Sequence, residues 1–108
     1  MGETGYVVVL ITAGSPAEAE QIARGLVEAR LAACVNIIPR VDSLFHWQGK
    51  LDTAAESLLI VKGRAARLDD IIALVKARHS YQVPEIITLP IAGGHPAYLD
   101  WLGRETAE

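Results

Sequence analysis

Among the one cysteine and three histidines of this chain, two residues are the candidate ligands for copper- or zinc-type metals. Cys34 lies in the run AACVN and is the only cysteine, and His79 stands just before SYQVPE. Thiolates and imidazoles are ligands for such metals, but structural zinc sites gather several of them at short spacings. No second cysteine stands at such a spacing. A zinc or iron–sulfur centre is therefore not supported by the pattern.

Each of these residues also has a structural interpretation. A lone cysteine among alanine and valine more often fills a core as a small hydrophobe, so we favour core filler for Cys34 over a thiolate ligand. His79 falls one turn after Val75, where an imidazole can cap a helix C-terminus and is favoured by the helix dipole. The functional alternative for His79 is a metal ligand, or a polar anchor of a cleft formed with Tyr81 and Glu85.

Catalytic combinations are scarce. The sequence has no nucleophile elbow with a serine, histidine and aspartate order, no glycine-rich phosphate loop after a strand, and no H-E-x-x-H motif. Glu56 and Lys62 lie on one face of an expected strand, which would allow a shared pocket, although a structural ion pair is the commoner explanation. We therefore expect a protein that is not an enzyme.

Length and composition restrict the class of protein. The chain has 108 residues, 51% of them hydrophobic, and a net charge of -3. This favours one domain over residues 1–108, with a core of about residues 6–102, and excludes disorder. It offers no basic field for nucleic acid, no secretory signal and no apolar run of the roughly 20 residues that a membrane helix needs. A single cysteine and these features predict a soluble, cytoplasmic protein.

The first elements can be read from periodicity and capping signals. YVVVLIT, residues 6–12, is apolar on both alternating faces and predicts a central strand. In SPAE, Ser15 can cap a helix, Pro16 suits its first position, and Glu18 stands where a capping box places an acid. Apolar residues at helical spacing then predict a helix over about residues 16–30.

A long, bent hairpin is expected next. Residues 31–47 have strand character on both sides of Pro39, which lacks an amide hydrogen and should mark a bend or bulge. Residues 48–50 predict a turn, and 56–62 the returning strand. A second amphipathic helix begins near Leu68 and ends near His79. A fourth strand falls within VPEIITLPI, and Pro96 starts a short last helix, with His95 just before it.

This order predicts an α+β fold, the ferredoxin-like βαββαβ sandwich with an additional C-terminal helix. Two helices would cover one face of a four-stranded sheet. The first strand is apolar on both faces, so the second face also needs a cover. Self-association is the simplest way to provide it.

Several separated motifs resemble one family. LAACVNIIPRVDSLFHWQGKL, ESLLIVK, HSYQVPEIITLPI and YLDWL, in this order between about Tyr6 and Leu102, closely resemble the CutA proteins, named for divalent-cation tolerance. The resemblance implies a ferredoxin-like subunit in a tight homotrimer, joined through strand edges and the long hairpin. It also implies a fold similar to that of the trimeric PII signalling proteins.

The resemblance links the chain to tolerance of copper and other divalent metals, and some members bind copper. Copper binding has been attributed to a cysteine, whose position here is Ile11, and to a histidine pair, which here is Arg78-His79. Only His79 remains, so the implied copper or other divalent-cation site is weak and no cofactor is required. Threonine is frequent in the family where Gly63 stands, and we expect the glycine to loosen the end of that strand.

The resemblance further implies an intersubunit ligand cleft. Its residues would be Trp47, Glu56, Lys62, Tyr81 and Glu85. Expected partners are two further copies of the chain and an unidentified protein, with neither nucleic acid nor membrane. The alternative to a metal-tolerance protein is a PII-like trimeric regulatory module that binds a small ligand or a partner protein in this cleft.

Overall fold

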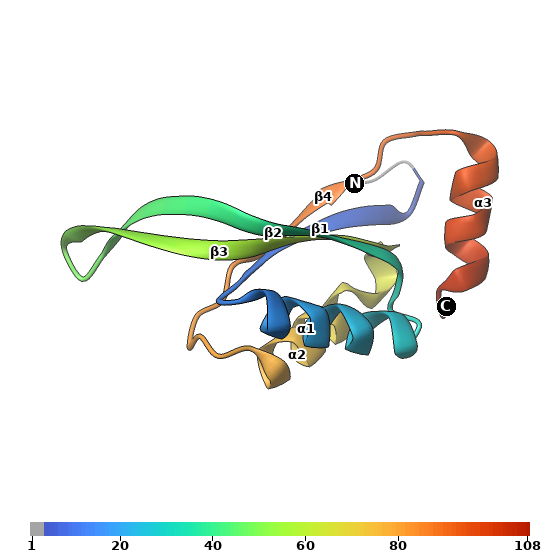
Figure 1. Ribbon diagram of the computed structural model, residues 1–108. Coiled ribbons are helices and arrows are strands. Elements are labelled where there is room, and N and C mark those ends of the chain that lie inside the picture. Colours follow the sequence, from blue (N-terminus) through green and yellow to red (C-terminus); the bar gives the residue numbers. More distant parts are fainter. Residues whose placement is uncertain (1–3) are drawn as a thin grey trace.

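The computed structural model describes residues 4–108, and its elements follow the predicted order (Figure 1). They are β1 (Tyr6–Ala13), α1 (Pro16–Glu28), β2 (Ala32–Trp47), β3 (Lys50–Arg64), one 3₁₀ turn (Ala65–Arg67), α2 (Leu68–Arg78), β4 (Ile86–Pro90) and α3 (Pro96–Glu105). The α+β class and the additional C-terminal helix are confirmed. Along residues 4–108, none of the helices combines the length and the apolar character required to cross a lipid bilayer.

The four strands form one antiparallel sheet in the order β2-β3-β1-β4, consistent with the ferredoxin-like arrangement. Figure 1 shows α1 and α2 side by side against one face of this sheet, and α3 apart from them at the end opposite the hairpin tip. α3 is fixed there by Arg64, which donates from Nη2 to the Gly103 carbonyl oxygen at 2.8 Å and from Nε to Thr106 Oγ1 at 2.9 Å.

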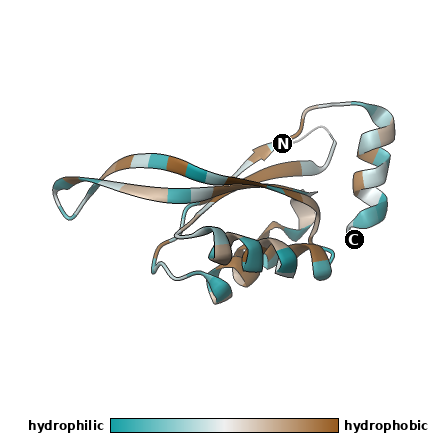
Figure 2. Ribbon diagram, viewed as in Figure 1, coloured by the Kyte–Doolittle hydropathy of each residue, from teal (hydrophilic) through white to brown (hydrophobic). Residues whose placement is uncertain are grey.

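The core lies between the sheet and the two helices. Alternate residues of the central strands are buried against the helices, and apolar stripes of α1 and α2 meet them. Figure 2 shows this concentration of apolar segments where the sheet crosses the helices. The fully buried large side chains of this core are Val9, Ile11, Ile22, Leu26, Leu59, Val61, Ile71 and Val75, and Leu102 of α3 is fully buried outside it.

Gly63 is required by close packing rather than being a loose end of the strand. A Cβ at this position would stand 2.6 Å from the Leu31 carbonyl oxygen, well inside van der Waals contact. The expectation that the glycine loosens the strand is therefore wrong. The glycine lets the chain segment before β2 approach β3 closely.

α1 is capped as predicted at its start and ends two residues earlier than predicted. Ser15 Oγ accepts the Glu18 amide hydrogen at 3.1 Å. The Glu18 carboxylate accepts from the amide of Gly14 rather than of Ser15, so only half of the expected capping box forms. After Glu28, Arg30 adopts a left-handed φ of 61°, and the Leu31 amide bonds the Leu26 carbonyl, which ends the helix in a Schellman motif.

β2 and β3 form a hairpin that projects beyond the helices (Figure 1). The register shifts between Ile38 and Val41, so the predicted irregularity at Pro39 is confirmed as a bulge. Gln48 and Gly49, with φ of 52° and 81°, form the two-residue turn. The returning strand begins at Lys50, not at residue 56. The residues before 56 carry little apolar signal because both of their faces are exposed, and main-chain pairing with β2 defines them as strand.

Candidate functional site

The polar centre of the chain is the junction where β1 ends, α1 begins and α2 ends. An open depression of about 620 Å³ lies here. Its lining comes from two segments, Gly14–Gln21 and Ala77–Tyr81. Because these segments are about 60 residues apart, the depression forms only when α1 and α2 pack against each other.

His79 stands at the C-cap position of α2, but its ring bonds another element. The side chain is 0% exposed. Its Nε2–H donates to the Thr12 carbonyl oxygen of β1 at 2.7 Å, and its Nδ1 accepts the Tyr81 amide hydrogen at 3.0 Å. This pair of bonds requires the neutral tautomer with hydrogen on Nε2. The capping interpretation is thus right about position and wrong about the partner carbonyl.

The Glu18 carboxylate ties the start of α1 to the segment after α2. It accepts from the Gly14 amide at 2.8 Å, from the Ser80 amide, and from Ser80 Oγ at 3.1 Å. Burial alone would raise the pKa of Glu18, but the hydrogen bonds from Gly14 and Ser80 outweigh burial and lower the pKa below its usual value. Glu18 is therefore an ionised acceptor for three donors of this chain.

Tyr81 connects this junction to the base of the hairpin. Its hydroxyl donates to Glu56 Oε2 at 2.9 Å, and its ring lies 4.7 Å from the His79 ring, tilted by 54°. Glu56 is only 8% exposed. Burial, together with the Glu56 carboxylate as acceptor and charge, raises the pKa of Tyr81 to about 12. The phenol is thus held as a neutral donor.

These residues do not fit a copper site. Both His79 nitrogens are already bonded, and the Glu18 carboxylate already has three donors. Within residues 4–108, no group of three or more His, Cys, Asp or Glu residues could hold a metal ion.

Cys34 lies elsewhere and is not core filler. It sits on β2 opposite Lys62 of β3, is partly exposed, and has its Sγ 3.8 Å from Asn36 Oδ1. The core-filler interpretation is wrong because the register shift between Ala32 and Cys34 turns the thiol to the sheet face opposite α1 and α2, where it lies near Tyr98 of α3.

The predicted cleft residues are only partly brought together by one chain. Glu56 and Tyr81 are in contact, whereas Trp47 is 54% exposed near the hairpin tip and Glu85 is exposed before β4. Lys62 donates to Asn36 Oδ1 and lies six residues along β3 from Glu56, about 20 Å in an extended strand. Glu56 and Lys62 therefore share no pocket within one chain.

Sequence reasoning missed Glu18 and Ser80 as site residues. The sequence indicates Glu18 only as part of a helix cap, and Ser80 belongs to no motif. Their contact joins residues 62 positions apart. No local signal predicts it.

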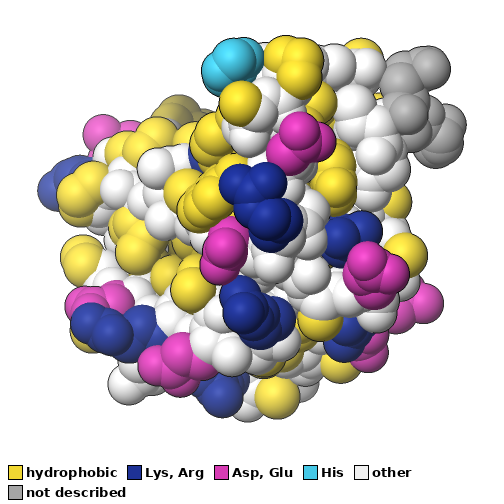
Figure 3. All heavy atoms as spheres, turned by 90° about the vertical axis from the view of Figure 1, so that its right-hand side faces the viewer, with side chains coloured by type: hydrophobic (Ala, Val, Ile, Leu, Met, Phe, Trp, Pro, Cys, Tyr) yellow, Lys and Arg dark blue, Asp and Glu magenta, His cyan; other side chains and the backbone are white. Residues whose placement is uncertain are grey.

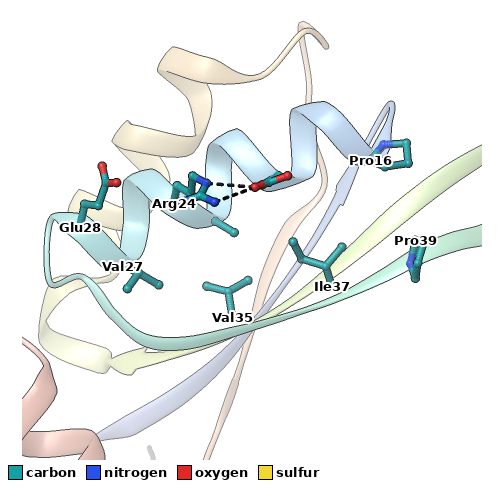
Figure 4. Close-up of a pocket in the computed structure, with 9 residues that line it drawn as sticks. Pro16, Arg24, Val27, Glu28, Val35, Ile37 and Pro39 are labelled. Carbon is teal, nitrogen blue, oxygen red and sulfur yellow. Dashed lines mark hydrogen bonds and ion pairs between the residues drawn. The ribbon is translucent and has the colours of Figure 1, made fainter.

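A second depression lies between α1 and the edge strand β2 (Figure 4). Figure 4 shows Val35 and Ile37 rising from β2 toward α1, Val27 on the helix side, and Pro39 at one end. Arg24 lies over it and pairs with Glu20 at 3.0 Å. This groove is apolar, with a charged rim.

The sheet face opposite α1 and α2 is also apolar. Strand alternation places Val8 and Leu10 of β1 on it, with Ile60 of β3 beside them. Ile87 and Leu89 of β4 are 53% and 52% exposed there. On the end of the molecule shown in Figure 3, by contrast, positive and negative side chains alternate among apolar ones.

Comparison with protein families gives one match over nearly the whole chain. Residues 7–105 match the model of the CutA1 divalent ion tolerance protein. The "Divalent-cation tolerance protein CutA" of Thermus thermophilus is 50% identical over 99 residues, covering 92% of this chain and 96% of that protein. The rice "Protein CutA 1, chloroplastic" is 45% identical over 102 residues, 94% of this chain and 58% of the rice protein. The chain thus spans little more than half the length of that plant relative.

Solved structures agree with this match. The structure of the divalent cation tolerance protein Cut A1 from Thermus thermophilus has a TM-score of 0.92 and 49% identity, and covers 94% of this chain and 99% of that one. The CutA1 structure from Oryza sativa has a TM-score of 0.93 and 45% identity, covering 95% and 94%.

Proposed function

The chain belongs to the family of CutA1 divalent ion tolerance proteins, and on this basis we propose that it acts in tolerance of, or response to, divalent metal ions such as copper. The observation that supports this most is the near full-length similarity to the Thermus thermophilus protein of that name. The proposal includes weak binding of copper-type ions, no catalysis and a cytoplasmic location.

Growth of cells tests the cation role. In a host whose own CutA gene is deleted, expression of this chain should raise the copper concentration that halves growth, relative to empty vector. Calorimetry with CuCl₂ on the purified protein tests weak binding separately. Equal growth with and without the chain, together with no heat of binding, would contradict the proposal.

We propose further that the working form is a homotrimer. The apolar sheet face and the exposed hairpin both support self-association, because large apolar patches rarely stay in water. The hairpin exposes Leu44, Trp47 and Leu51 by 68%, 54% and 67%. The Cα radius of gyration is 14.3 Å, against about 13 Å for a compact chain of this length. Light scattering should give about three times the chain mass of 11.6 kDa.

A PII-like ligand-binding module is the second candidate. The contact that favours it is the hydrogen bond from the Tyr81 hydroxyl to the buried Glu56 carboxylate. This contact holds two polar groups at the base of the β2–β3 hairpin, which would reach a neighbouring subunit. In a trimer, Trp47, Lys62 and Glu85 of other copies would complete a cleft. A small ligand of the native state raises the melting temperature, so a metabolite panel tests this function, and no shift across the panel would count against it.

A further inference from the structure

We infer that His79 is a neutral residue whose two hydrogen bonds position Tyr81 against Glu56, and that it is not a ligand for divalent cations. This inference does not depend on the proposed function. A metal-tolerance protein can bind cations through other residues, and a ligand-binding module would need the same two hydrogen bonds of His79.

Neither ring nitrogen of His79 has a free lone pair for a metal. An imidazole binds a metal through a ring nitrogen that carries no hydrogen. In His79, Nε2 carries the hydrogen that is donated to Thr12, and the lone pair of Nδ1 accepts from Tyr81. A metal would have to displace one of these two hydrogen bonds. It would also have to reach the His79 ring, whose side chain is 0% exposed.

The carboxylate next to His79 is that of Glu18, whose Oε2 lies 3.7 Å from His79 Nδ1. A carboxylate beside an imidazole could suggest a pair of ligands. However, Gly14 and Ser80 donate three hydrogen bonds to this carboxylate, which accounts for its charge without a cation. Metal binding here would leave these donors without an acceptor, at a cost.

The two hydrogen bonds of His79 also position its neighbours. His79 joins the end of α2 to β1 through Thr12, and its second bond fixes the backbone of Tyr81. The Tyr81 ring then packs on the imidazole, with its hydroxyl on Glu56. His79 is therefore a positioning residue for a predicted cleft contact that one chain forms by itself.

The exposed His46 and His95 are internal controls for the claim that His79 does not bind divalent cations. Imidazole ¹⁵N spectra of the wild-type protein, assigned with His79→Gln, should show His79 as the Nε2–H tautomer. During CuCl₂ addition, His46 and His95 should broaden before His79, or no ring should broaden at all. Broadening of His79 first would overturn the inference, whatever growth assays show for the cation role.

Substitutions of His79 test whether it positions Tyr81 against Glu56. His79→Ala removes both bonds, whereas His79→Gln keeps a side-chain amide that can donate to Thr12. Ultraviolet titration, with Tyr81→Phe to assign the signal, should show Tyr81 ionising nearer its ordinary pKa of about 10 in His79→Ala, with partial recovery in His79→Gln. Unchanged Tyr81 ionisation in a folded His79→Ala protein would overturn the positioning role.

Discussion

At the scale of single residues, the junction between β1, α1 and α2 and its link to the hairpin depend on two carboxylates and one phenol. Glu18 is 13% exposed and serves three donors, while Glu56 is 8% exposed and has Tyr81 as its donor. Buried acceptors of this kind contribute little when satisfied and cost much when they lose their partners. Mutations at the two sites should therefore affect stability more than substitutions of exposed glutamates would.

We expect Glu18→Gln to lower the free energy of unfolding at pH 7 by about 1–3 kcal/mol, because an amide cannot replace a charged acceptor for three donors. The folded pKa of Glu18 is lowered from 4.5, so its contribution is complete above pH 4.5 and is lost as the pH falls through the folded pKa. Urea unfolding at pH 7 and pH 3.5 measures this. The difference between wild type and variant should shrink at pH 3.5, and a constant difference would contradict the assignment.

We expect Tyr81→Phe to destabilise the protein by about 1–3 kcal/mol, because it leaves the Glu56 carboxylate without its donor. A double-mutant cycle with Glu56→Ala isolates the contact, because alanine leaves no acceptor for the hydroxyl. Denaturant unfolding at one protein concentration should show the double variant to be less destabilised than the sum of the single ones. Strict additivity would mean that the hydroxyl and carboxylate do not interact in solution.

At the scale of elements, packing between segments accounts for features that strand and helix patterns leave open. The Pro39 bulge is held by Ser57, whose hydroxyl donates to the Pro39 carbonyl oxygen at 2.7 Å. Gly63 admits the Leu31 backbone against β3. The first contact fixes β2 against β3 at the bulge, and the second fixes the chain before β2 against the last residues of β3.

We expect Gly63→Ala to lower the free energy of unfolding by about 1–3 kcal/mol, because its Cβ would stand 2.6 Å from the Leu31 carbonyl oxygen and the backbone must shift. Gly93→Ala is the matched control, since nothing lies within 4 Å of its Cβ position. Thermal unfolding should separate the two variants clearly. Equal melting temperatures would show that the backbone near Gly63 can shift to admit a Cβ without loss of stability.

At the scale of the whole molecule, the single chain leaves one sheet face and one hairpin uncovered. α1 and α2 cover only the other face, and this asymmetry of the sandwich supports the proposed self-association. The proposed homotrimer would bury the apolar residues of β1, β3 and β4.

We expect Ile87→Lys to shift the proposed trimer to single chains, because an ammonium at this position would be desolvated without a partner. Ala73→Lys, at an exposed position of α2 on the helix layer, is the control and should leave the mass unchanged. Light scattering at micromolar concentration measures both. A trimer that survives Ile87→Lys would show that this face is not the interface.

Much of the architecture follows from local sequence. Alternation in YVVVLIT, the Ser15-Pro16 start of α1 and the proline within β2 each act over a few residues, so their consequences could be predicted. The errors arose where distant segments decide. Pairing with β2 extended β3 to Lys50, and a register shift turned Cys34 out of the core.

The sequence by itself determined the order of the elements, the bend in the hairpin and the family, because these depend on short-range periodicity and on motifs in order. Only the tertiary structure decided what His79 does. Its Thr12 acceptor is 67 residues away in the chain, and its neighbour Ser80 meets Glu18 across 62 residues. Such bonds form when α1, α2 and β1 pack together, and no local pattern records which donors will then face which acceptors.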